Sequence, residues 1–335
     1  MSVRDSFSVP AALAVLAVLA WLSPATAVAD VRTLTATGEY RMGDNDTKTD
    51  AKRLALLDAK RLALEQVGTY LEGVTEVKNL SVTKDEIRSY TAGIVEVVEQ
   101  ATRSTLEGET TVVRVDVTVK VDKAVVTKQL GELRKNELAK EELLRAKADA
   151  DLLRKELDEK NKQLAALKGS EADTAVQQRQ QVLARADANE LVARTWQVPA
   201  GAKDDIVTKT KTPTAEELAK YRMMLEAALK LDPDNPWAHF KLGHLYHSEG
   251  NLDAAIQEYR TTIRLKPDAA RPHLALGRAL KAQGKKQEGA EEMYAYLMLA
   301  EKNPANKPLI ERTERQLNQS QRQGKRRSNG LPSRR

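Results

Sequence analysis

The chain has 335 residues and a formal net charge of +6; 30% of its residues are charged, 4% are aromatic and none is cysteine. Its length allows about two domains of roughly 150 residues each, and its composition favours helical hairpins or a coiled coil over one large core. Without cysteine the chain has no disulfide, thiolate metal site, cysteine nucleophile or cysteine-linked lipid anchor.

Residues 1–29 are predicted to be a signal peptide. Val9 to Leu22 form an apolar run, and Ala27-Val28-Ala29 places small residues at the two positions that a signal peptidase reads. We therefore expect cleavage before Asp30 and a mature chain that is exported to the periplasm or the outer envelope. The alternative is an uncleaved membrane anchor, because Arg4 is the only basic residue before the apolar run.

Residues 30–123 are predicted to form a small α+β domain, a helix on an antiparallel sheet. Val31 to Tyr40 reads as a strand, and Asp50 to Leu71 has the spacing of an amphipathic helix. Two further strands, Ile94 to Leu106 and Glu109 to Val121, are joined by a hairpin turn. The last strand alternates valine with polar residues, which predicts one buried face for the helix to cover.

This domain resembles the amino-terminal domain of flagellar assembly protein T and related small outer-membrane lipoproteins. The resemblance lies in Thr37-Gly38-Glu39-Tyr40, in the alanine-rich helix that runs from Asp50 to Gln66, and in the Val-x-Val alternation of the hairpin. It implies an envelope protein with a structural or assembly role.

An acidic turn separates the first strand from the helix. Asp44, Asp46 and Asp50 together suggest calcium, but the EF-hand template fails because Lys48 and Ala55 stand where a ligand and the bidentate glutamate are required. We interpret the three acids as capping residues at the helix amino terminus.

Residues 124–194 are predicted to form a coiled coil or a helical hairpin. Leucine and alanine recur at alternating steps of four and three from Ala139 to Leu167, with Lys160 as the polar interruption. This seam can pair with a second copy of the chain, which is the preferred interpretation, or fold back on the helix expected over residues 173–192. Residues 195–213, with two prolines and a glycine, are predicted to be a linker.

Residues 214–321 resemble a tetratricopeptide repeat (TPR) array. An offset of 34 residues, the TPR period, pairs identical residues, and Gly243 and Gly277 are such a pair. The other pairs are Leu231 with Leu265, Pro233 with Pro267, His239 with His273, Leu242 with Leu276, and Gly250 with Gly284. The resemblance implies an all-α solenoid, with a helix over Pro308 to Gln321 as its cap.

The last 14 residues, 322–335, are predicted to be a disordered basic tail. They contain six basic residues and no acid, which accounts for the whole net charge of +6. The rest of the chain is therefore near neutral, and the tail is a candidate contact with the envelope surface.

The resemblance also implies a peptide-binding groove along the first helix of each repeat. Transferred by position, the groove residues in this chain are Trp237, Phe240, His244, His247, Arg271, Arg278 and Lys281. These residues include three permanent cations and no acid, which predicts a partner protein with an acidic segment or a carboxy-terminal carboxylate. The alternative interpretation is an ordinary solvated helix face.

No catalytic motif stands out. The sequence shows no Ser-His-acid arrangement or zinc motif, and Gly284-Lys285-Lys286 is a helix turn rather than a phosphate loop. His244 and His247 have no further metal ligands at a suitable spacing, so we expect no metal and no cofactor. We expect a non-enzymatic envelope scaffold, with a cell-wall-acting enzyme or its activator as the alternative; nucleic-acid binding conflicts with export.

Overall fold

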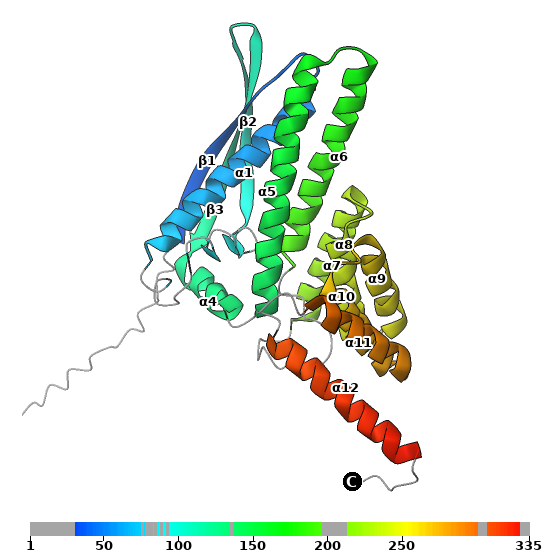
Figure 1. Cartoon of the computed structure of the whole chain (residues 1–335). Coiled ribbons are helices and arrows are strands. Elements are labelled where there is room, and N and C mark those ends of the chain that lie inside the picture. Colours follow the sequence, from blue (N-terminus) through cyan, green and yellow to red (C-terminus); the bar gives the residue numbers. More distant parts are fainter. Residues whose placement is uncertain are drawn as a thin grey trace, which may run out of the picture.

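The computed structural model describes residues 31–74, 77, 83, 86–87, 90–91, 94–134, 137–195, 213–300 and 307–328. The predicted signal peptide with its cleavage site, most of the predicted linker and the last residues of the predicted tail lie outside the described residues. Figure 1 shows three parts: a sheet with a helix on it, a long helical hairpin, and a stack of shorter helices.

The sheet has three antiparallel strands: β1 (Val31–Arg41), β2 (Val97–Glu107) and β3 (Thr110–Asp122). Their order is β1-β3-β2, so the strand with the clearest alternation lies in the centre. Helix α1 (Lys48–Glu72) packs against β1 and β3. The structure therefore contains the helix on an antiparallel sheet that the sequence predicts.

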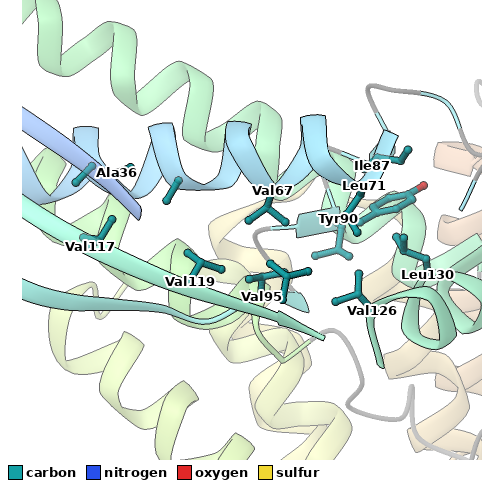
Figure 2. Packing of buried hydrophobic residues seen from close by; sticks show 14 of the residues in the cluster. Ala36, Val67, Leu71, Ile87, Tyr90, Val95, Val117, Val119, Val126 and Leu130 are labelled. Atoms are coloured by element: carbon teal, nitrogen blue, oxygen red, sulfur yellow. The ribbon is translucent and has the colours of Figure 1, made fainter. Parts of the chain in front are cut away.

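The core of this domain lies between α1 and β3. The valines at alternate positions of β3 are buried, and in Figure 2 Val117 and Val119 lie on the side of the sheet that faces α1. The helix comes close because it turns alanines toward the sheet and because β1 has Gly38 at the crossing. A Cβ atom at Gly38 would lie 2.1 Å from the carbonyl oxygen of Ala55, so this position requires glycine.

Helices α4 (Lys123–Arg134), α5 (Glu137–Ala166) and α6 (Ser170–Ala193) follow the sheet. The turn between α5 and α6 is short, and its Gly169 has φ +62°. The two helices run antiparallel, so this segment is a helical hairpin within one chain (Figure 1).

Four leucines of the seam that favoured pairing with a second copy are buried inside the chain: Leu143, Leu153, Leu157 and Leu164. Leu153 and Leu157 pack with Leu54 of α1 and with two residues of α6, Val182 and Leu183. These leucines therefore offer no surface to a second copy, and the preferred interpretation of the seam is corrected. A repeat of three and four residues describes any helix buried along one stripe, whether its partner is the same chain or another.

The acidic turn is neutralised by an arginine from the distant helix α6. The Arg179 guanidinium forms an ion pair with Asp46 and lies 3.4 Å from an oxygen of Asp50. Arg179 is fully buried. The hydroxyl of Tyr40 donates a hydrogen bond of 3.0 Å to Asp46, and burial together with that carboxylate raises the pKa of Tyr40 to about 12. The cation that this acidic cluster suggests is thus a side chain of the protein.

Helical repeats form the carboxy-terminal part. Its helices are α7 (Ala215–Leu231), α8 (Pro236–Ser248), α9 (Leu252–Leu265), α10 (Ala270–Ala282), α11 (Lys286–Ala300) and α12 (Lys307–Ser328). Leu309, Ile310 and Leu317 of α12 pack onto the last repeat, as expected of a cap. Helix α12 continues to Ser328, so the prediction of disorder from residue 322 is wrong for residues 322–328.

Among the described helices, none has the length and apolar character needed to cross a membrane.

Candidate groove of the helical repeats

The two repeats are α8 with α9 and α10 with α11. They have glycines at equivalent turn positions, 34 residues apart. Each first helix is followed by a glycine with positive φ, +80° at Gly250 and +94° at Gly284, which lets the chain reverse. Each repeat also has a glycine where its two helices touch. A Cβ atom at Gly277 would lie 2.7 Å from the carbonyl oxygen of Gly289 in α11. These glycines allow the two helices of each repeat to pack closely.

A histidine and a glutamate join the two helices of each repeat. His239 Nδ1 lies 2.7 Å from Glu258 Oε2, and His273 Nδ1 lies 2.7 Å from Glu292 Oε2. The hydrogen bond to Glu258 raises the pKa of His239 above its ordinary value of 6.5, although burial and Arg264 act in the opposite direction. The offset of 34 also pairs the two glutamates, so the same search could have found them.

Two of the predicted groove residues belong to the interior of the first repeat. Phe240 and His244 are only 3% and 4% exposed. Their ring centroids lie 4.3 Å apart, and both rings contact the fully buried Tyr259 of α9. Both residues pack α8 against α9. The predicted groove residues that remain partly exposed are Trp237, His247, Arg271, Arg278 and Lys281.

The amino-terminal part of α5 contacts α8 and α10, including the predicted groove residues Trp237 and Arg271. The Glu142 carboxylate forms an ion pair with Lys241 of α8, and its other oxygen lies 3.7 Å from Arg271 of α10. One turn later, the guanidinium of Arg145 lies 4.1 Å from the centre of the Trp237 ring. Between α5 and α8 remains a cavity of about 40 Å³, too small for a ligand larger than water. Sequence reasoning missed this contact, because Glu142 and Lys241 are 99 positions apart and no local pattern links them.

Two further predicted groove residues, Arg278 and Lys281, lie one turn apart on α10, and we call this part of the helix the basic end of the groove. Burial lowers the pKa of Lys281, and the neighbouring cations Lys286 and Arg278 lower it further.

A larger cleft of about 370 Å³ lies between α1, α5 and α6. Its floor is largely apolar, and its rim is charged. Rim charges pair within the chain, as in Lys60 with Glu190 at 2.8 Å and Arg61 with Glu65 at 2.9 Å. We therefore assign no ligand to this cleft. Among the described residues, no cluster of histidine, aspartate or glutamate side chains has the arrangement of a metal site.

Comparison with known proteins supports the repeat architecture. Residues 225–250 and 243–284, from α7 to the turn after α10, match the family described as TPR repeat. One solved structure with a similar part is the CopN-Scc3 complex, with 16% identity over 36% of this chain and 82% of that chain; its TM-score of 0.27 is too low to support an argument. No curated protein matches the chain. The 34-residue period is thus confirmed as a TPR repeat.

Proposed function

We propose that the chain is a non-enzymatic scaffold or assembly protein of the bacterial envelope, and that its TPR groove binds a partner protein. The observation that carries the proposal is the basic end of the groove, where Arg278 and Lys281 lie one turn apart on α10. Residues 225–250 and 243–284 match the TPR repeat, and stacked helical repeats of this kind form extended concave surfaces that bind other molecules. The lowered pKa of Lys281 reflects both burial and the like charges around it.

The partner would present an acidic segment or a carboxy-terminal carboxylate. An arginine guanidinium can give a carboxylate two parallel hydrogen bonds, and a lysine ammonium adds a compact charge. Partly buried cations are screened less by salt than exposed ones, but binding should still weaken as ionic strength rises.

The proposal includes a location outside the cytoplasm. The apolar run and the Ala27-Val28-Ala29 site support export with cleavage before Asp30, and the resemblance of residues 30–123 to flagellar assembly protein T supports an envelope role. Amino-terminal sequencing of the protein from fractionated cells tests this part. A chain that begins at Asp30 is expected, and an intact Met1 in the cytosol would overturn it.

The groove itself is tested by charge reversal. The full chain is used as bait in an envelope extract, and the affinity of each captured protein is then measured. Arg278→Glu with Lys281→Glu should weaken partner binding tenfold or more, about 1.4 kcal/mol. The control is Lys220→Glu with Lys230→Glu, which makes the same charge change on exposed positions of α7. Equal affinity of the folded groove variant and the control would show that the groove is not the site.

A further inference from the structure

The end of α5 that lies on the groove presents two charged side chains on one face. Glu142 and Arg145 are three residues apart, which places them together on the same side of a helix. Glu142 reaches a lysine of the first repeat and an arginine of the second, and Arg145 covers the ring of Trp237. We call Trp237, Lys241 and Arg271 the Trp237 site.

The contact is well removed from water. The side chains of Lys241, Arg271 and Glu142 are 6%, 10% and 16% exposed. Charges that leave water to this extent need a partner of opposite sign, so Lys241 and Arg271 require an anion at this position. In the isolated chain Glu142 provides it.

The shape of the site fits a helix. TPR grooves are expected to take extended peptides, but the segment seated on Trp237 is the regular helix α5. Its carboxylate and its guanidinium contact different residues of the groove, one turn apart. A ligand that makes both contacts must hold a glutamate and an arginine at helical spacing.

We propose that the Trp237 site is a docking site for a helix with Glu and Arg three residues apart, and that α5 occupies it until a partner helix with this pair displaces Glu142 and Arg145. The proposal rests on the proposed function only in that the partner is a protein that binds these repeats. Leu143, between the two charged residues, is buried in the core of the sheet domain. Occupancy of the site by a partner therefore loosens one tie between that domain and the repeats.

The test compares three forms of the full chain with one probe, a fluorescently labelled synthetic peptide of residues 137–152. The opened form carries Glu142→Gln and Arg145→Ala. The matched control carries Glu159→Gln and Lys155→Ala, which remove one acid and one base from exposed positions of the same helix. Circular dichroism and urea unfolding establish that each form is folded, and fluorescence anisotropy gives the affinities.

The peptide should bind the opened form at least tenfold more tightly than the wild type or the control. A tethered helix competes at an effective concentration of about a millimolar, so the wild-type site is closed to the weaker free peptide. Adding Trp237→Ala and Lys241→Ala to the opened form should abolish binding, as should a peptide without the Glu-Arg pair. Equal affinities for the three forms, or no binding to the opened form, would overturn the proposal.

These outcomes are separate from those of the proposed function. If partner capture depends on Arg278 and Lys281 but the opened form does not bind the peptide, the groove function stands and the helix site is wrong. If the opened form binds the peptide but partner capture does not depend on Arg278 and Lys281, the helix site stands and the basic end is not the partner's site.

Discussion

Gly243 of α8 lies against the ring of Tyr259 in α9, so closely that a Cβ atom would come within 2.5 Å of the ring carbon Cε1. Tyr259 is fully buried and cannot move without disturbing the repeat. Alanine favours a helix by about 1 kcal/mol over glycine, but overpacking costs about 1–3 kcal/mol or more. We expect Gly243→Ala to lower the free energy of unfolding by about 1–2 kcal/mol, measured by urea unfolding.

Gly277→Ala should destabilise the chain more than Gly243→Ala. The atom that its Cβ would meet at 2.7 Å is the backbone oxygen of Gly289, and a backbone yields less readily than a ring. Separate unfolding curves for the two variants give the order. If both variants are as stable as the wild type, the close approach of the paired helices is not needed.

The stability of the first repeat should depend on pH through His239. Its folded pKa is raised above 6.5, so between these two values the folded state binds more protons than the unfolded state. The stabilisation is therefore fully present below pH 6.5 and is lost as pH rises through the folded pKa. The difference in unfolding free energy between wild type and His239→Gln, measured from pH 5 to 8.5, should shrink with rising pH. A constant difference would contradict the role of the Glu258 hydrogen bond.

The buried ion cluster should be sensitive to the loss of its cation. Arg179→Leu leaves Asp46 and Asp50 without their counter-charge in a buried site, which typically costs about 3–5 kcal/mol. Adding Asp46→Asn and Asp50→Asn should restore a large part of the loss, because no unpaired charge then remains. Urea unfolding of the single and triple variants tests this, and an equal loss in both would show that packing rather than charge is responsible.

The same substitution should have a large effect at one of two neighbouring leucines of α5 and little effect at the other. Leu153 is 8% exposed between α1 and α6, whereas Leu152 is 63% exposed. Leu153→Asp buries an unpaired carboxylate and should destabilise the hairpin by about 3–5 kcal/mol, while Leu152→Asp should change stability by about 0.5 kcal/mol or less. Light scattering on the same samples should show no change in mass. A drop in mass for a folded Leu153→Asp variant would restore the self-association hypothesis.

The elements of the sheet domain could be predicted because their signals are local. The valine alternation of β3 sets its buried face, and the alanine spacing of α1 sets the face that meets it. The strand order could not be predicted, because the pairing of Tyr40 with Val113 joins residues far apart in sequence. Patterns with a period of two or of 3.6 report which face is buried but not what buries it.

The same reason explains what was missed at the groove. The period of 34 revealed the repeats and their first helices, since it compares the chain with itself. It could not reveal that Glu142 fills the space beside Lys241, or that Arg179 is the cation of the acidic turn. Both contacts depend on where the hairpin lies in three dimensions.

The hairpin has a consequence for the spacing between the sheet domain and the repeats. Helix α5 leaves from α4 and α6 returns to the same end, so the sheet domain and the repeats meet at the base of the hairpin while its tip lies at the far end (Figure 1). At the tip, the Asn45 side chain donates hydrogen bonds of 3.2 Å to two carbonyls, that of Leu164 in the last turn of α5 and that of Leu167 just after the helix. Lengthening both helices by equal whole turns would move the tip and leave the spacing of the two domains unchanged. The hairpin therefore packs alongside α1, and its length does not set the spacing between the two domains.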